Sequence, residues 1–424
     1  MVRTLVVTCL LCCAPLTCLA QAAPELPDSP AYRGEIRRSA DGKLIAVEEK
    51  RAGDNREPLR PATLIVGPQE QVRTITEAAK AARDGDIIEI LPGDYRGQPA
   101  IWTQDNLIIR GKGPRPVLIA DGKSAENKGL WVIRGGKIRL ENIEFRGTRV
   151  DAGNGAGIRF EKGDLTIHRC AFIDNEMGVL TANTPTLTLT VSDSEFADAP
   201  RHEGSLHHLL YVGQIGKFTL TGSRISNGYR GHLVKSRARE NHVRYNLLAD
   251  GPDGHASYEL EFPNGGIAFV IGNVIAQSPD TDNPILVSYG AEGPHWPDNT
   301  LYFAHNTLIN DRFGGTFLTS WPDKIGANAE IWIINNLTVG NGDLFAPAHG
   351  RFEGNLSARR DELIAYAGLP LRPKTDSPLR GQVRIPGQAR GIDLLPDAEF
   401  LFPTGQRPMA PGRSLAPGAF QNPR

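Results

Sequence analysis

The sequence predicts an all-β solenoid, in which short coils stack along one axis, and three observations favour it. A module of one apolar strand, a turn and a second apolar strand recurs along most of the chain. The 424 residues include 46 glycines and 31 prolines, which suits many short strands joined by tight turns. Only one amphipathic helix stands out, so strands do not alternate with crossover helices as they do in α/β domains. A solenoid also suits the length, because it grows along an axis instead of enlarging a single core.

The first 22 residues have the pattern of a secretory signal peptide. Arg3 supplies the positive start, LVVTCLLCC the apolar run, and Ala20-Gln21-Ala22 a small-residue cleavage site. The apolar run is too short to span a bilayer. Four of the five cysteines lie in this segment, so the secreted chain keeps only Cys170 and forms no internal disulfide. We expect a secreted or periplasmic protein, cleaved near Ala20–Ala22.

The charge is nearly balanced. Without Arg3 the chain keeps 46 of its 47 basic residues against 48 acidic ones, a formal charge of about −2. No basic excess indicates a nucleic-acid partner, and no basic amphipathic helix indicates binding to a membrane surface. We therefore expect a monomer whose partner is a polysaccharide, with neither nucleic acid nor membrane insertion.

Beyond the signal segment the chain divides into three parts. Residues 23–62 are polar and irregular, with a candidate hairpin around Asp41-Gly42. Residues 63–357 hold the repeated strands. Residues 358–424 are rich in Pro, Gly and Arg, and apolar runs such as Phe400-Leu401-Phe402 predict a tail packed on the solenoid rather than a free linker.

Nine copies of the repeat align at one position. They begin at Ile143, Cys170, Ser194, Ser223, Asn246, Asn273, Asn306, Asn336 and Asn355. Stacked coils place equivalent residues about 4.8 Å apart, so the five asparagines predict a ladder of amide hydrogen bonds at one corner. Cys170 shares this column and is interpreted as a small buried residue, not a nucleophile.

A helix is predicted near residues 74–83, where Thr74 and Glu77 form a candidate capping box. A short amphipathic helix followed by a run of short strands resembles the N-terminal cap of right-handed parallel β-helix proteins, the pectin-lyase-like superfamily. The resemblance implies a solenoid with a capping helix and an irregular C-terminal tail. An ordinary helix–strand unit of an α/β domain is the alternative, and the absence of further helices disfavours it.

Polar residues concentrate between Tyr229 and Gly266. Strand alternation predicts that His255, Glu259 and Glu261 point outward while Tyr258 points inward. Neighbouring coils are expected to bring Tyr211, His232, Lys235 and Ser288 close to them, with Tyr289 and Glu292 on the next coil. The predicted catalytic residues are Lys235, His255, Glu259 and Glu261. The predicted substrate-binding residues are Tyr211, Arg230, His232, Arg237, Tyr258, Ser288, Tyr289 and Glu292.

The stretch HLVKSRARENHVRYN, residues 232–246, resembles one coil of the alginate lyases and chondroitinase B, a β-helix polysaccharide lyase family. The resemblance implies β-elimination on an acidic, uronate-containing polysaccharide, with Lys235 as the base. It also implies a Ca²⁺ ion, but the metal-binding glutamate reads as Arg230 and the position of the assisting arginine falls near Glu261. We therefore expect no cofactor, with Arg230 neutralising the substrate carboxylate and His255 or Tyr258 available for proton transfer.

Three alternatives stay open. Glu259 and Glu261, two residues apart on one strand, would lie about 6.5–7 Å apart, at the edge of the window for an inverting glycoside hydrolase. A β-helix that binds carbohydrate without catalysis, or serves as an envelope scaffold, would also carry polar side chains on its flank. The charges around Lys235 would then be an ion-pair network, His207-His208 surface histidines and Tyr289 a core residue.

Overall fold

The computed structural model describes residues 35–38, 44–47, 60–202, 204, 206–281, 283–326, 328–366, 368–409 and 415–421. The predicted signal peptide lies outside the described residues. Strands β1 (Glu35–Arg38) and β2 (Leu44–Val47) pair antiparallel, which confirms the hairpin expected around Asp41-Gly42. They belong to the first of two compact units, residues 1–50, and the second unit, residues 51–424, holds the elements below.

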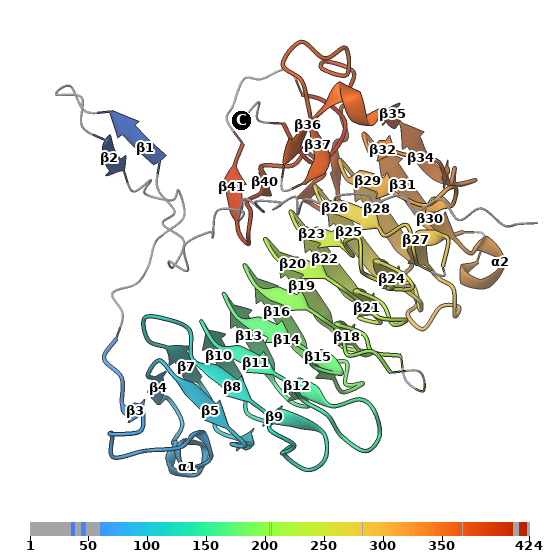
Figure 1. The fold of residues 1–424 in the computed structure, drawn as a ribbon. Coiled ribbons are helices and arrows are strands. Elements are labelled where there is room, and N and C mark those ends of the chain that lie inside the picture. The colour runs from blue at the N-terminus through green and yellow to red at the C-terminus, as the bar shows by residue number, and fades with distance from the viewer. Residues whose placement is uncertain are drawn as a thin grey trace, which may run out of the picture. The chain divides into compact units, whose positions relative to one another are not determined.

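The second unit is a parallel β-helix, which confirms the predicted fold class (Figure 1). Successive coils contribute one strand to each of three parallel sheets, and each strand pairs with the equivalent strand of the next coil. The three sheets, called first, second and third below, contain 12, 11 and 10 strands within the described residues.

The first sheet consists of β3 (Leu64–Val66), β4 (Ile87–Ile90), β7 (Leu107–Gly111), β10 (Lys137–Glu141), β13 (Asp164–His168), β16 (Thr188–Ser192), β19 (Lys217–Thr221), β22 (Glu240–Arg244), β25 (Ile267–Ile271), β28 (Thr300–Ala304), β31 (Glu330–Ile334) and β34 (Gly350–Glu353). The second consists of β5 (Asp94–Arg96), β8 (Val117–Ile119), β11 (Glu144–Arg146), β14 (Ala171–Ile173), β17 (Glu195–Ala197), β20 (Arg224–Ser226), β23 (Leu247–Ala249), β26 (Val274–Gln277), β29 (Thr307–Asn310), β32 (Leu337–Val339) and β35 (Leu356–Ala358). The third consists of β6 (Ala100–Trp102), β9 (Gly129–Ile133), β12 (Ala156–Phe160), β15 (Met177–Thr181), β18 (Leu210–Val212), β21 (Val234–Ser236), β24 (Leu260–Phe262), β27 (Ile285–Tyr289), β30 (Thr316–Ser320) and β33 (Asp343–Leu344).

Helix α1 (Ile75–Ala81) forms where the capping box predicts it. The Thr74 hydroxyl accepts a hydrogen bond from the Glu77 amide, and the Glu77 carboxylate accepts one from the Thr74 amide, both at 3.1 Å. Its apolar face buries Ile75, Ala78 and Ala79 in the core of the β-helix. A second short helix, α2 (Pro322–Ile325), follows β30. No helix among the described residues is long and apolar enough to cross a membrane.

The corner between the first and second sheets carries the predicted asparagine ladder. Asn273 accepts hydrogen bonds from the backbone amide and side chain of Asn246, at 3.0 and 2.9 Å, and donates to Asn306 at 3.0 Å. The same pattern continues through Asn336 to Asn355. The residue before each ladder position has positive φ, even where it is His305 (53°), and the ladder offsets the cost of that conformation.

Replacing Asn273 with alanine is expected to lower the free energy of unfolding by about 1–3 kcal/mol, because it removes the acceptor of the buried Asn246 amide and the donor to the Val243 carbonyl. Urea denaturation measures the loss. Asn355→Ala is the matched control, since Asn355 ends the ladder and is only half-buried, and its loss should be smaller. Equal losses for the two variants would contradict a cooperative ladder.

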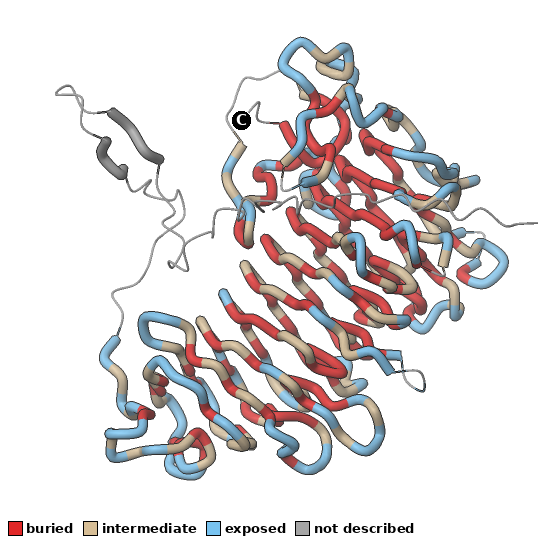
Figure 2. Tube along the Cα trace, in the orientation of Figure 1, coloured by how far each residue is buried: buried red, intermediate tan, exposed pale blue. Residues whose placement is uncertain are grey.

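Buried residues recur along the strands of the β-helix (Figure 2), and aromatic rings are among the largest fully buried side chains. Trp131, Phe145, Phe172 and Phe196 form a continuous row of rings, with centroids 4.9, 5.1 and 4.6 Å apart; the first pair meets edge to face and the other two pairs are stacked. Cys170 is fully buried, in agreement with its interpretation as a core residue. This interior holds the strands in register, so that their outward side chains are placed coil by coil.

The tail after β35 contains a 3₁₀ turn, η1 (Arg360–Glu362), and three antiparallel pairs. These are β36 (Leu363–Tyr366) with β37 (Leu369–Pro373), β38 (Gln388–Ala389) with β39 (Ile392–Asp393), and β40 (Ala398–Phe400) with β41 (Gln406–Pro408). Phe400 and Phe420 are buried in one apolar cluster with Val274 and Ile309 of the second sheet. Leu394 packs on the outer face of the first sheet in the same way. The third sheet thus keeps its outer face clear of these clusters.

Candidate functional site

The outer face of the third sheet carries a row of side chains, one from each successive coil. Parallel pairing places Tyr211 of β18 beside Lys235 of β21, and Lys235 beside Glu261 of β24. Ser288 of β27 comes next to Glu261. Adjacent parallel strands lie about 4.8 Å apart, so these side chains are immediate neighbours. The structure confirms that coil stacking gathers Tyr211, Lys235, Glu261 and Ser288.

Glu261 lies at the centre of this row and contacts two basic groups. One of its carboxylate oxygens is 3.0 Å from His232 Nδ1 and 3.2 Å from Lys235 Nζ. Its side chain is only 4% exposed. Burial alone would raise the pKa of Glu261, but the close contact and charge of His232 and the charge of Lys235 bring it below its usual value. Glu261 is therefore an ionised carboxylate that orients both neighbours.

His208, His232 and Tyr258 form a parallel column one step away from the row. Their rings contact one another edge to face, with centroids 4.5 Å apart for the two histidines and 4.9 Å for His232 and Tyr258. His208 Nδ1 accepts a hydrogen bond from the His232 amide at 2.8 Å, so the His208 proton lies on Nε2. Burial lowers the pKa of both histidines, although Glu261 opposes the effect at His232.

Both histidines are therefore neutral near neutral pH. The Glu261 carboxylate lies 3.0 Å from His232 Nδ1, outside hydrogen-bond geometry, and its negative charge favours the tautomer with the proton on Nδ1. That tautomer leaves the Nε2 lone pair as a proton acceptor. His208 presents the opposite chemistry, an Nε2–H donor. The column thus combines one base and one hydrogen-bond donor beside the charged row.

A second carboxylate, Glu292, reaches the row from a loop after β27. Its oxygens lie 2.5 and 2.9 Å from two guanidinium nitrogens of Arg237 and 3.2 Å from Lys235 Nζ. The hydrogen bonds from Arg237 are the main cause that lowers the pKa of Glu292 to about 2. Arg237 Nε also donates to the Tyr211 hydroxyl at 3.2 Å, and Arg237 contacts the Asn264 side-chain oxygen. Arg237 thus connects Tyr211, Asn264 and Glu292.

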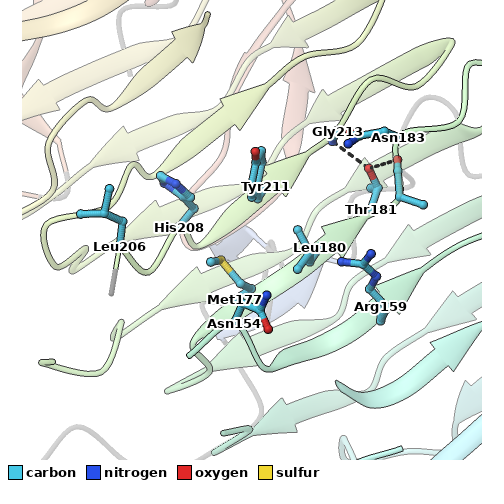
Figure 3. A pocket seen from close by; sticks show the side chains of 11 residues that line it. Asn154, Arg159, Met177, Leu180, Thr181, Asn183, Leu206, His208, Tyr211 and Gly213 are labelled. Carbon is cyan, nitrogen blue, oxygen red and sulfur yellow. Dashed lines mark hydrogen bonds between the residues drawn. The ribbon is translucent and has the colours of Figure 1, made fainter. Parts of the chain in front are cut away.

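A groove of about 320 Å³ continues from Tyr211 and His208 towards the preceding coils (Figure 3). It is lined by Asn154, Arg159, Met177, Leu180, Thr181, Ala182, Asn183, Leu206, His208, Tyr211 and Gly213. Met177 and Leu180 supply apolar surface, and Arg159, Asn154 and Asn183 supply polar groups beside it. Such a mixture suits a sugar, which has apolar faces and a polar rim.

Tyr258 was predicted to point inward and Glu259 outward, and the structure shows the reverse. Tyr258 is half-buried beside His232, whereas Glu259 is fully buried. The preceding coils show the reason. Leu209 and Leu233 occupy the same place, one residue before the paired strand, and both are buried, so strict alternation fails at this corner.

Glu259 therefore has no place on the flank, and the carboxylate pair required by the glycoside hydrolase alternative does not form there. Neither carboxylate oxygen of Glu259 has a hydrogen-bond partner among the described residues. Burial, reinforced by the nearby Asp250 carboxylate, raises the pKa of Glu259 well above its usual value. Glu259 is a protonated core residue, and the prediction of a catalytic Glu259 on the flank is wrong.

Three other predicted residues, Tyr289, His255 and Arg230, lie outside the row, and Ser288, the last member of the row, is buried. Tyr289 is a core residue whose hydroxyl donates to the Gly266 carbonyl at 2.6 Å, so its predicted contact with substrate is wrong. Ser288 is also buried and accepts a hydrogen bond from Trp321 Nε1 at 3.1 Å. His255 pairs with Tyr229, six residues before Lys235, and donates to the Asp280 carbonyl. Arg230 is exposed, at a left-handed turn with φ 58°.

Three residues of the site were not predicted as site residues from the sequence. One of the open alternatives made His208 a surface histidine, but it is buried against His232, so that part of the alternative is wrong. Its signal was present, because HLLY (208–211), HLVK (232–235) and YELE (258–261) align as three successive coils. Asn264 and Trp296 had no such signal. Trp296 Nε1 donates to the Arg237 carbonyl at 3.0 Å from a loop far along the chain.

The Ca²⁺ ion that the lyase resemblance implies does not fit these residues. Calcium takes six to eight oxygen ligands, mainly carboxylates and carbonyls. Here Glu261 and Glu292 are each already in contact with Lys235, and Arg230 stands where the resemblance requires a glutamate. Among the described residues, no group of three or more His, Cys, Asp or Glu side chains is placed to hold a metal ion. Independence from a cofactor stays a prediction.

Comparison with known proteins bears on the fold. No protein-family model matches the sequence, and no curated protein matches it. Among solved structures, pectate lyase Pel9A superimposes with a TM-score of 0.60 and 12% sequence identity, over 85% of this chain and 97% of that chain. A similarity at this identity shows the architecture and not the activity. The chain therefore has the parallel β-helix fold of the pectin-lyase-like type.

Proposed function

We propose that the protein is a secreted lyase that cleaves an acidic, uronate-containing polysaccharide by β-elimination at the outer face of the third sheet. One observation carries the proposal. Two cations, Lys235 and Arg237, converge there with a neutral histidine, His232, that Glu261 orients. The groove beside Tyr211 and the β-helix fold, which a pectate lyase shares, support it.

β-Elimination makes three demands on a protein. A base takes the proton from the carbon beside the carboxylate, and the electrons of that C–H bond form the new carbon–carbon double bond. The neighbouring bond to the glycosidic oxygen then breaks, and that oxygen takes a proton from an acid. The substrate carboxylate becomes electron-rich during the first step, so fixed positive charge beside it lowers the barrier.

The row of charged residues and the column of His208, His232 and Tyr258 supply a group for each of these three requirements. His232 Nε2 accepts the proton, because burial keeps the ring neutral and the nearby Glu261 charge favours the tautomer protonated on Nδ1. Lys235 and Arg237 neutralise the substrate carboxylate, with Arg237 suited to bidentate binding. The Tyr211 hydroxyl accepts a hydrogen bond from Arg237, so its own proton is free to reach the leaving oxygen. Lys235, which the resemblance makes the base, acts in this proposal as an electrostatic partner.

A second candidate function is carbohydrate binding without catalysis, or a scaffold role. It rests on a specific observation. The two cations Lys235 and Arg237 are matched by the two carboxylates Glu261 and Glu292, so every charge in the cluster already has a partner. These ion pairs would be sufficient for a purely structural role, in which the cluster stabilises the outer face of the third sheet.

Replacing Lys235 with methionine is expected to lower kcat/KM on the preferred polysaccharide by about 10²- to 10³-fold, since it removes one charge beside the developing anion. The ultraviolet absorbance of the unsaturated uronate product measures the rate on alginate, pectate, hyaluronan and glucuronan. Lys217→Met is the matched control, because Lys217 also pairs with a glutamate, Glu240, but on the first sheet. Its activity should equal that of the wild type.

The structural alternative predicts a different result. Lys235→Ala would then lower the melting temperature by leaving Glu261 without its cation, and the double variant Lys235→Ala/Glu261→Ala would recover part of the loss. That recovery, with no unsaturated product from any of the four polymers in the wild type, would reject the lyase.

A further inference from the structure

Glu292 is held as a bound carboxylate ligand would be. Two nitrogens of Arg237 face its two oxygens at 2.5 and 2.9 Å, and Lys235 Nζ lies 3.2 Å from one of them. Paired N–H donors on a planar carboxylate are the usual geometry by which arginine recognises carboxylate ligands. The chain thus places its own carboxylate on the two cations that the proposed reaction requires.

The backbone that carries Glu292 is fixed without help from the carboxylate. The Glu292 amide donates to the Pro263 carbonyl at 2.8 Å, and the His295 amide donates to the Asn264 carbonyl at 3.1 Å. Trp296 adds its hydrogen bond to the Arg237 carbonyl. The side chain can therefore turn away from the cations by rotation about its own bonds, while the loop stays in place.

The two carboxylates of the cluster differ in how easily they leave. The Glu292 side chain is 43% exposed, so water can solvate its charge after it turns outward. The Glu261 side chain is 4% exposed and lies between His232 and Lys235, so it has no such route. When another carboxylate displaces Glu292, the net charge around Lys235 and Arg237 does not change. An anion that bound while Glu292 stayed in place would give this site an excess of negative charge.

We infer that Lys235 and Arg237 form a carboxylate-exchange site, which Glu292 occupies in the free protein and from which a uronate carboxylate of the polysaccharide displaces it. The inference rests on the proposed function for the identity of the incoming group. Glu292 competes with every anion, so a small carboxylate binds weakly. A polymer gains further contacts along the groove beside Tyr211 and displaces Glu292 more readily.

Glu292→Gln tests the exchange directly, because it keeps the shape of the side chain and removes its charge. Titration calorimetry with sodium D-glucuronate should show affinity about ten-fold higher than in the wild type, as expected if Glu292 fills the site about nine-tenths of the time. Glu353→Gln, which removes the partner of Arg351 on the first sheet, is the matched control and should change nothing. The double variant Glu292→Gln/Arg237→Gln should lose the gain.

The outcomes separate the exchange from the lyase activity. A gain in glucuronate affinity without cleavage of any uronate polymer supports the exchange and rejects the lyase. Equal or weaker affinity in Glu292→Gln overturns the exchange, whether or not the polymers are cleaved. A gain for glucose 6-sulfate and not for glucuronate also overturns it as stated, because the site would then select a sulfate ester.

Discussion

His232→Gln is expected to lower kcat on the acidic polysaccharide by about 10²- to 10⁴-fold while the melting temperature changes little. The glutamine amide can still contact Glu261, but it has no lone pair basic enough to take a carbon-bound proton. Initial rates of unsaturated uronate formation measure the effect. His242→Gln is the control, since His242 also contacts a glutamate, Glu240, at 2.6 Å, but on the outer face of the first sheet.

The pH dependence gives a second readout of the same residue. A base must be unprotonated to act, so kcat falls as the pH drops below the pKa of His232. Burial lowers that pKa, so the fall should begin below the usual histidine range. A rate that stays constant through the acidic range, or a His242→Gln variant as inactive as His232→Gln, would assign the proton transfer to another group.

Glu259→Leu is expected to raise the free energy of unfolding by about 1–3 kcal/mol at about pH 4.5, and by more at neutral pH, because it replaces a buried carboxyl group that has no hydrogen-bond partner among the described residues. Leucine fits the position, since Leu209 and Leu233 occupy it in the two preceding coils and Leu286 in the next. Urea denaturation of the two proteins measures the difference.

The gain should depend on pH in a defined direction. The folded-state pKa of Glu259 is raised, so the unfolded chain ionises while the folded one stays protonated. Its contribution to stability is therefore complete below about pH 4.5 and falls by about 1.4 kcal/mol per pH unit above that, until the folded-state pKa is reached. Glu259→Gln keeps the polar group but should lose this slope. A wild-type slope that survives in both variants would contradict a buried, protonated Glu259.

Much of the fold follows from local patterns in the sequence. The ladder from Asn246 to Asn355 was visible because each coil repeats the same polar residue after the same apolar strand, and stacking then leaves one arrangement. The capping box at Thr74 and Glu77 depends on residues three positions apart. Such features involve neighbours in the chain or strict repetition, so the order of the residues is enough to predict them.

The proximity of Tyr211, Lys235 and Glu261 was predictable for the same reason, since equivalent positions repeat from coil to coil, but the outward facing of Lys235 was not. The inward facing of Glu259 could not be predicted. Glu259 lies where the chain enters the strand, and there two consecutive residues, Glu259 and Leu260, are both buried. Alternation is a property of paired backbone, and it ends where the pairing ends.

The sequence by itself determined the coils, their ladder and the row of polar residues on one flank. Only the tertiary structure decided what those residues contact. Glu292 reaches Lys235 across 57 positions of the chain, and the histidine column forms because three coils bring His208, His232 and Tyr258 into register. These contacts depend on loop paths and on depth from the surface, which set the pKa values of His232 and Glu259 and which no local pattern encodes.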